Sequence, residues 1–509
     1  MSILAFVLAL LPIVWLIVSL GFLKMRAPLA CIIGLILTII LAIFGFKLSP
    51  LNTFTGTIDG IALGLWPIVY VIIAALFTYN VTNKSGGIRI IQDVLSSITT
   101  DKRILVLIIA WGFGGFLEAI AGFGTAVAIP AGILIAFGFE PIKAAIICLI
   151  ANTTPTAFGA VGLPVITLAN VTQLPQKPLS YTVTLQLLFL VIIIPYILVI
   201  LTGNGFKSLK GVGFITFMAG LSFALPQIFI AKFIGAELPA ILGSLICIGI
   251  TVLLAKLKNK KNIETKSDIP QHSPKEFIRA CSPFILVFVF VLLASSLFPP
   301  INHFLNAFTS KIQIYTGKNA SPFSINWLSS PGTLILLATF IGGKIQGFNF
   351  KQLFEILFTT IKGLGKTAIT VCSIVALAKV MGYAGMTQAL ATSFVKIMGP
   401  FYPVIAPLIG ALGTFITGSD TSANVLFGNL QLSAAKSLGA DVNWVVSSNM
   451  VGATAGKMIS PQSIAVASAA INKEGSESTI LKQALKWCGL YLVIICIYLY
   501  VSGLLLHKF

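Results

Sequence analysis

The sequence has few charged residues: only 9% of its 509 residues are Asp, Glu, Lys or Arg, whereas 57% are hydrophobic. So little charge cannot cover the surface of a soluble protein of this size, because most charge must face water. Apolar runs of the length needed to cross a bilayer, roughly 20 residues, recur along the chain. The chain is therefore predicted to be an all-α polytopic membrane protein.

Residue patterns that carry enzyme chemistry are also scarce. The three histidines, His272, His303 and His507, fall in predicted loops or in the tail, and no paired acids, H-E-x-x-H or G-x-S-x-G pattern occurs. The chain has no P-loop or other nucleotide-binding signature, which argues against direct coupling to ATP. An intramembrane enzyme is therefore disfavoured, and we expect neither a metal nor another cofactor.

Cysteines at metal-binding or redox spacing are missing as well. The chain has no C-x-x-C pair, and its seven cysteines lie mainly in or beside apolar segments, which predicts buried thiols. The N-terminal apolar run lacks a basic leader and a small-residue cleavage site. It is therefore predicted to be a retained membrane span and not a signal peptide.

Acidic residues are outnumbered, 14 against 33 basic ones, for a net charge of +19. The basic residues occupy short loops between apolar spans and do not form one face with interleaved aromatics, so nucleic acid is not an expected partner. If the chain starts outside, 23 basic residues fall in inside loops and eight in outside loops or the tail. This bias predicts that both termini lie outside.

The predicted topology has twelve spans and two re-entrant hairpins. Ten spans are regular, near 3–23, 28–46, 57–78, 181–202, 211–231, 235–255, 280–298, 331–343, 363–383 and 486–507. Two more, 142–170 and 442–470, are interrupted by Asn and small polar residues. Before each interrupted span comes a Gly-broken segment, 104–138 or 400–435, that is predicted to be a hairpin.

The two interrupted blocks repeat one pattern. Asn152 and Asn449, like Pro164 and Pro461, are 297 residues apart. Inside basic residues flank the first hairpin and outside ones flank the second, so the two copies are predicted to be inverted repeats. The halves are 1–255 and 280–509, and the hydrophilic segment 256–279 is a cytoplasmic linker, for which contact with anionic lipid is a weaker alternative.

Paired interrupted segments in corresponding halves indicate the binding site of a transporter. ANTTPT (151–156) and SSNMVGATAG (447–456) are expected to be non-helical and to line a cavity, because unpaired backbone does not survive in hydrocarbon. A helix that restarts after such a break offers N–H groups to an anion. The predicted substrate-binding residues are Asn152, Thr153, Thr154, Ser419, Thr421, Ser448, Asn449 and Lys457. Hydrogen bonding between helices is the alternative role for these side chains.

Small residues at the hairpin tips, Gly122, Gly124, Gly418 and Ala423, are expected to let the tips approach the breaks closely. We expect Asn152 and Asn449 to cap or brace the ends of the half-helices.

Four ionisable residues, Glu118, Lys379, Asp420 and Lys457, fall in the membrane segments, where a charge costs about 2.5–3.5 kcal/mol at a helix centre. Glu118 and Asp420 are candidates for proton coupling, with Asp420 slightly preferred. Lys457 is expected to attract an anion. An ion pair of Lys379 with Glu118 or Asp420 remains an alternative that would only lock helices together.

At these residues the chain resembles the lactate permease family. The segments GFGGFLEAIAGFGTAVAIPAGILIAFGFEP and ANTTPTAFGAVGLPV are similar to its N-terminal signature, and FITGSDTSANVLFGNLQ with SPQSIAVA to its C-terminal one. The family belongs to a larger group with inverted repeats and re-entrant hairpins. Relatives there carry Ser-Asn-Thr motifs; the matching residues here are Ala151, Asn152, Thr153 and Ser448, Asn449, Met450, and each copy differs by one residue.

The resemblance implies a secondary active transporter in a bacterial inner membrane. Its substrates would be L-lactate and related 2-hydroxymonocarboxylates, D-lactate and glycolate, carried with protons. Partners would be that carboxylate, protons and membrane lipid, with a homodimer implied by the larger group. The clustering of polar residues in two blocks favours an elevator mechanism, in which hairpins and broken helices slide against regular spans. A sodium-coupled carboxylate carrier and an anion channel are the alternatives.

Overall fold

The computed structural model describes residues 3–16, 18–19, 23, 25–120, 122, 125–203, 205–259, 272–294, 298–317, 322–471 and 476–509. Gly124, residues 260–271 of the linker, and the topology markers Lys24, Lys318 and Lys473 lie outside these residues. In the described part, eleven helices are long and apolar enough to cross a membrane. The predicted all-α polytopic class is therefore confirmed.

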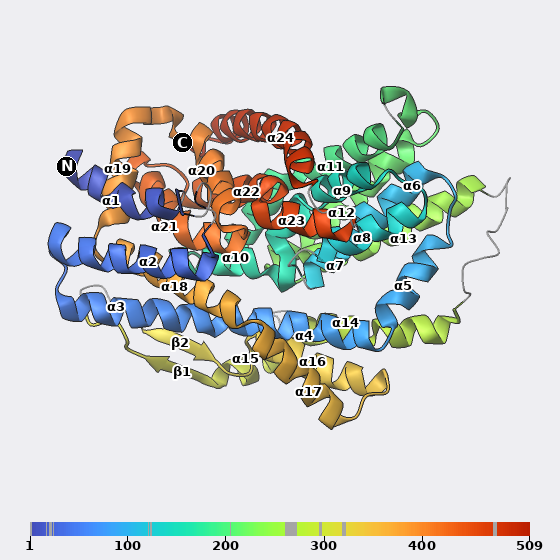
Figure 1. Ribbon diagram of the computed structural model, residues 1–509, viewed down its shortest axis with the longest axis horizontal. Coiled ribbons are helices and arrows are strands. Elements are labelled where there is room, and N and C mark those ends of the chain that lie inside the picture. The colour runs from blue at the N-terminus through green and yellow to red at the C-terminus, as the bar shows by residue number, and fades with distance from the viewer. Residues whose placement is uncertain are drawn as a thin grey trace.

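The helices pack in two groups, which we name after their central helices. The α18 group packs around α18 and lies along the lower part of Figure 1. Its members are α2 (Ala27–Ile40), η2 (Leu41–Gly45), α3 (Pro50–Leu63), η3 (Gly64–Val69), α4 (Tyr70–Lys84), α5 (Gly87–Ser96), α14 (Pro274–Ala294), α15 (Pro299–Ala307), α16 (Pro331–Ile345), α17 (Phe350–Gly363) and α18 (Gly365–Tyr383).

The α22 group holds both segments that were predicted to be hairpins and both interrupted spans. From the first half it contains α6 (Lys102–Val106), η4 (Leu107–Phe113), α7 (Gly114–Ile120), α8 (Thr125–Ala136), α9 (Pro141–Ala151), η5 (Thr154–Phe158), α10 (Gly159–Thr172), α11 (Gln176–Gly203), η6 (Phe206–Leu209), α12 (Gly213–Phe233) and α13 (Pro239–Asn259). From the second half it contains α20 (Tyr402–Thr417), α21 (Asp420–Leu438), α22 (Val442–Ile459), α23 (Pro461–Ala470) and α24 (Glu477–Leu505).

Two helices connect the groups. α1 (Ile3–Leu16) packs on α2 and on α19 (Met386–Met398), which leads through η7 (Gly399–Phe401) into α20 and also contacts α21. Direct contacts between the groups include those of α18 with α21, of α4 with α7 and α10, and of α5 with η4. The regular helices α11–α13 and α24 pack on the interrupted ones and not on the α18 group.

One small sheet was not predicted from the sequence. β1 (Thr309–Ile312) and β2 (Phe323–Asn326) pair antiparallel, with Thr309 opposite Asn326. Strands of four residues each in a polar loop carry too little alternation of apolar and polar side chains to be recognised.

The span predicted at 57–78 is wrong at both ends. Ser49 accepts a hydrogen bond from the Asn52 amide and Pro50 occupies the first turn, so the helix starts well before the apolar run. α3, η3 and α4 then continue to Lys84, with non-helical backbone at Trp66. Asp59, which stood at the edge of the predicted span, therefore lies well inside α3 and is only 4% exposed.

Both termini lie at the same end of the long axis, with α5 and α6 at the opposite end (Figure 1). This arrangement agrees with an even number of crossings. The side of the membrane on which the termini lie stays a prediction.

Candidate functional site

The first interrupted segment, expected to be non-helical, is a turn at Asn152 and Thr153 followed by the 3₁₀ helix η5. α9 ends at Ala151 and Asn152 is its C-cap residue. After the 3₁₀ turn η5, Ala160, Val161 and Gly162 have φ values of 43°, 58° and 78°, in the left-handed region. A β-branched residue seldom adopts this conformation, so the backbone here is strained. Regular helix resumes around Leu163 and Pro164.

The prediction for the second interrupted segment was wrong. SSNMVGATAG lies within the continuous helix α22, and the chain leaves the helix only at Ser460, whose φ and ψ are −61° and 140°. Helix resumes at Pro461, and the Ser460 hydroxyl accepts a hydrogen bond from the Ser463 amide at 3.2 Å. Pro164 and Pro461 therefore both stand in the first turn of a restarting helix.

Close packing explains why the glycines of α22 do not break it. A Cβ atom on Gly452 or Gly456 would collide with the carbonyl groups of Pro407 or Ala411 on α20. These glycines let the α20 and α22 backbones touch, which is the use of small residues at helix interfaces in membranes. From sequence alone the same residues suggested an interruption.

The described part of each predicted hairpin tip lies against the restart of its own half. A Cβ on Gly122 would lie 3.6 Å from the Ala160 Cβ, and one on Gly418 would overlap the Gln462 side chain. α20 and α21 meet at Gly418, which has a φ of 72°, and Ser419 caps α21. The tips therefore lie against Ala160 and Gln462, and not against the predicted breaks at 151–156 and 447–456.

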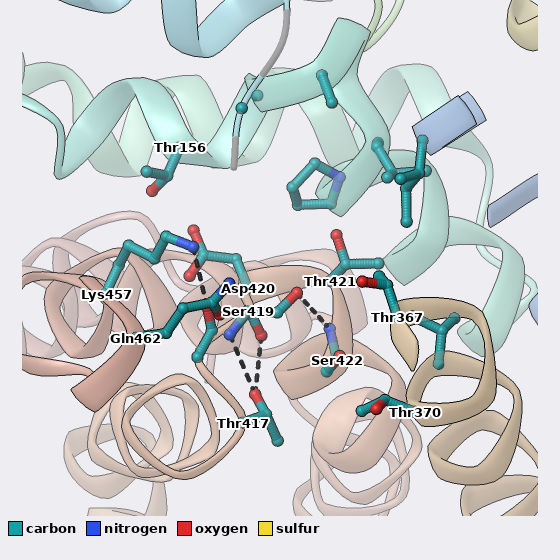
Figure 2. Close-up of a pocket in the computed structure, with 18 of the residues that line it drawn as sticks. Thr156, Thr367, Thr370, Thr417, Ser419, Asp420, Thr421, Ser422, Lys457 and Gln462 are labelled. Atoms are coloured by element: carbon teal, nitrogen blue, oxygen red, sulfur yellow. Dashed lines mark hydrogen bonds between the residues drawn. The ribbon is translucent and has the colours of Figure 1, made fainter. Parts of the chain in front are cut away.

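A cavity of about 410 Å³ lies where these elements meet. Both acids predicted for proton coupling, Glu118 and Asp420, line it together with Ser419, Thr421 and Lys457. Figure 2 shows Lys457 reaching toward Asp420, below Thr156. The other polar lining residues are Thr156, Lys366, Thr367, Thr370, Thr417, Ser422 and Gln462.

The two acids are buried and poorly solvated. Glu118 is 4% exposed and Asp420 is 3% exposed. Glu118 Oε2 and both Asp420 carboxylate oxygens make no hydrogen bond of good geometry with described residues, although the hydroxyls of Thr156 and Thr414 lie near Asp420. An ionised carboxylate in such a place is costly, so these groups need a proton, a cation or water when the site closes.

Lys457 is the cation nearest to this pair of acids on the same group of helices. Its ammonium donates a hydrogen bond to the Gly418 carbonyl at 2.9 Å, which ties the end of α22 to the α20–α21 turn. None of the ion pairs made by described residues includes Lys457, Glu118 or Asp420. An ammonium has three N–H donors, so donors remain for an anion in the cavity.

Five of the predicted binding residues lie behind the cavity wall. Asn152, Thr153, Thr154, Ser448 and Asn449 are buried but do not line the cavity. The Thr153 hydroxyl donates to the Ile150 carbonyl, and the Ser448 hydroxyl donates to the Trp444 carbonyl. The Ser448 hydroxyl also accepts a hydrogen bond from Gln186 Nε2 of α11 at 3.5 Å. Contact of Thr153 and Ser448 with a substrate stays a prediction.

Asn449 does not cap a half-helix, contrary to the prediction, because α22 continues through it. Its amide nitrogen donates to Asn424 Oδ1 at 3.0 Å and its oxygen accepts from Gln431 Nε2 at 3.2 Å. Asn424 in turn donates to the carbonyl of Pro164, and Gln431 accepts from the Tyr402 hydroxyl. This buried amide chain joins α10, α20, α21 and α22, so it stabilises the α22 group as one unit.

Lys379 forms an ion pair, but not with Glu118 or Asp420. Its Nζ lies 3.0 Å from Asp59 Oδ2, which also accepts a hydrogen bond from the Tyr383 hydroxyl at 2.6 Å. The pair joins α3 to α18 and lines a second cavity of about 730 Å³. The sequence missed Asp59 because it stood at the edge of the span predicted too short.

Sequence reasoning also left out the contribution of α18. The cavity is also lined by Lys366, Thr367 and Thr370. The second and third of these residues follow Lys366 by one and four positions, which puts all three on one side of a helix. This spacing at the start of the predicted span 363–383 was the available signal. Described residues include no group of three or more His, Cys, Asp or Glu side chains placed to hold a metal ion.

Interrupted helices that wall a charged cavity inside a many-helix membrane bundle define a multi-pass membrane transporter, and not an enzyme. More specifically, the chain belongs to the L-lactate permease family, whose model matches residues 5–506. The resemblance predicted from the sequence is thereby confirmed.

Individual relatives agree with this membership. The chain is 57% identical to the L-lactate permease of Streptococcus iniae, over 86% of this chain and 92% of that protein. It is 36% identical to the glycolate permease GlcA of Escherichia coli strain K12, over 94% and 92%. Among solved structures it is similar to MtrF of Neisseria gonorrhoeae, with a TM-score of 0.52 over 92% of this chain and 94% of that one. At 12% identity this last likeness concerns the fold alone.

Proposed function

We propose that this protein is a secondary active transporter that carries L-lactate and related 2-hydroxymonocarboxylates, such as D-lactate and glycolate, together with protons. The observation that carries the proposal is the cavity lined by Lys457, several hydroxyl groups and two acids that form no ion pair with described residues. Its volume of about 410 Å³ is in the range of small-molecule sites. The names of the relatives support lactate and glycolate as substrates.

The lining fits the two functional groups of a 2-hydroxymonocarboxylate. Lys457 would hold the carboxylate by a charge-assisted hydrogen bond, and the hydroxyls of Ser419 and Thr421 are placed to bond the carboxylate or the 2-hydroxyl group. None of the described residues that line the cavity is an arginine. The carboxylate would therefore be recognised by an ammonium and hydroxyls without a bidentate clamp.

Charge balance supports coupling to protons. Each bound monocarboxylate adds one negative charge to a cavity that already holds Glu118 and Asp420. Moving that added charge through a low-dielectric region is costly, and protonation of either acid would cancel it. Asp420 is the stronger candidate because it opens α21 at the tip, beside Ser419 and Thr421.

We infer an elevator movement of the α22 group against the α18 group. The amide chain and the glycine contacts of α20 with α22 hold the α22 group together. Helices α11–α13 and α24 would move with this group, which enlarges the moving unit beyond the hairpins and broken helices. A homodimer formed through the α18 group would hold that group static while the α22 group moves.

The test is uptake of labelled L-lactate into proteoliposomes with an imposed inward proton gradient. Wild-type protein should concentrate lactate. Asp420→Asn and Glu118→Gln should each abolish this accumulation while sparing lactate exchange, which needs no net proton release. Accumulation driven by a sodium gradient would favour the sodium-coupled carrier, and uptake that never exceeds equilibrium would favour the channel. If both variants still concentrate lactate, the proton travels on another group.

A further inference from the structure

The two helix groups contribute unequal numbers of polar residues to the cavity wall. Both acids, Lys457 and most hydroxyls come from the α22 group. The polar lining residues from the α18 group are Lys366, Thr367 and Thr370, all from the first two turns of α18. Figure 2 shows Thr367 and Thr370 on the opposite side of the cavity from Lys457.

We propose that Lys366, Thr367 and Thr370 are a second half of the carboxylate site and contact the substrate in only one of the two facing states. The inference rests on the proposed function and goes beyond it by naming recognition residues on the other helix group. We call these three residues the α18 patch.

Chemistry favours a carboxylate as the ligand of the α18 patch. A carboxylate has two oxygens with about four acceptor positions, more than the donors left on Lys457 can fill from one side. The patch offers a second ammonium and two hydroxyls across the same cavity. Asp420 and Glu118, both more than nine-tenths buried and with unpartnered oxygens, also line this space. With one acid protonated, as the proposed coupling requires, two ammoniums balance the other acid and the substrate carboxylate.

The packing of α18 makes the contact dependent on state. α18 packs chiefly on α2 and α3, whereas Lys457 is fixed to the α20–α21 turn through the Gly418 carbonyl. Alternating access requires the two groups to move relative to each other. Such a movement carries Lys457 and the acids away from Lys366. The basic residues around the start of α18 predict that this end faces the cytoplasm, so the patch would act on substrate from the cytoplasmic side.

The experiment compares the two faces of the membrane. Half-saturating concentrations of labelled L-lactate are measured in right-side-out and inside-out vesicles, with saturating unlabelled lactate on the opposite side. Lys366→Gln should raise the half-saturating lactate concentration at the cytoplasmic face about three- to tenfold and leave that at the external face unchanged. Lys366→Arg, which keeps the charge, should restore most of the affinity. Thr367→Val with Thr370→Val should raise the cytoplasmic value about two- to tenfold.

Lys362→Gln is the matched control. Lys362 stands four residues earlier on α17, is exposed and does not line the cavity, so its loss should change neither face. An unchanged cytoplasmic value in Lys366→Gln, or an equal rise at both faces, would overturn the inference. Failure of the wild-type protein to exchange lactate would instead overturn the proposed function.

Discussion

Glu118 fits its site only because residue 159 is glycine. An added Cβ on Gly159 would lie 2.7 Å from Glu118 Oε1, closer than packed atoms approach. The carboxyl group therefore occupies the space that any other residue at 159 would fill, next to the strained turn at Ala160 and Val161.

Gly159→Ala should therefore displace the Glu118 carboxyl and lower proton-driven lactate accumulation at least tenfold, with little change in the amount of protein in the membrane. Gly132→Ala is the control, because an added Cβ on Gly132 of α8 meets nothing within 4 Å. Both variants are measured by uptake in proteoliposomes at matched protein content. Normal accumulation by Gly159→Ala would show that the position of Glu118 is not critical.

The Asp59–Lys379 pair is expected to stabilise the packing of α3 on α18. Asp59→Asn would leave the Lys379 ammonium beside a neutral amide, at a cost of about 1–3 kcal/mol, between the values for exposed and buried pairs. The melting temperature of the purified protein should fall, and Asp59→Asn with Lys379→Gln should recover part of the loss. If the losses of Asp59→Asn and Lys379→Gln simply add in the double variant, the two side chains are not coupled.

At the scale of residues, the location of the charged side chains in the site could be predicted from the sequence, and the role of the amide side chains could not. Charged residues are so costly in a membrane that Glu118, Asp420 and Lys457 could be assigned to one site from the sequence, and all three line the cavity. An Asn or Ser in a membrane helix satisfies its hydrogen bonds equally well with a ligand or with a neighbouring helix. Asn449 bonds to a neighbouring helix, and nothing in the sequence distinguished this role from binding a ligand.

At the scale of elements, the two copies show why glycine is an ambiguous signal. ANTTPT contains proline and side chains that favour turns, and it leaves the α-helix for a turn and a 3₁₀ helix. SSNMVGATAG contains only small residues, whose effect depends on what packs against them. Because α20 lies directly on Gly452 and Gly456, that segment stays helical. The restarts at Pro164 and Pro461 were predictable, because proline favours a first helical turn.

Gly452→Ala should destabilise the contact of α20 with α22. The added methyl would collide with the carbonyl of Pro407, a backbone group that cannot rotate away, and overpacking of this kind costs about 1–3 kcal/mol. The melting temperature and the lactate uptake should both fall. Gly489→Ala on α24, where an added Cβ meets nothing within 4 Å, should change neither. Unchanged stability of Gly452→Ala would mean that the two helices separate easily.

At the scale of the whole molecule, the sequence predicted the kind of fold but not which helices pack together. The count of basic residues indicates on which side a loop lies, because loops are placed by charge during insertion. It carries no information on which helix packs on which. The regular spans 181–202, 211–231 and 235–255 were thus expected in the static part, whereas α11–α13 pack with the interrupted helices.

A cross-link between the two groups should stop transport, and one within a group should not. Thr367 of α18 and Thr421 of α21 line the same cavity from different groups (Figure 2). With both changed to cysteine, the loss of these two lining hydroxyls should itself lower exchange, so the uncross-linked double-cysteine variant is the reference. A short bifunctional thiol reagent should fix the groups in the present arrangement and abolish the exchange that this variant retains, because exchange still requires alternating access. The partly exposed native thiols Cys281 and Cys372 are replaced beforehand to keep the reaction specific.

Thr78 and Thr339 provide the control for this experiment. Their hydroxyls lie 2.6 Å apart on α4 and α16, both in the α18 group, so a cross-link between cysteines at these positions joins helices that move together. Exchange should continue after this cross-link and after reduction of either variant. If the Thr367–Thr421 cross-link forms in full and exchange persists, then α18 and α21 do not separate during the cycle. The division into a moving α22 group and a static α18 group would then be wrong.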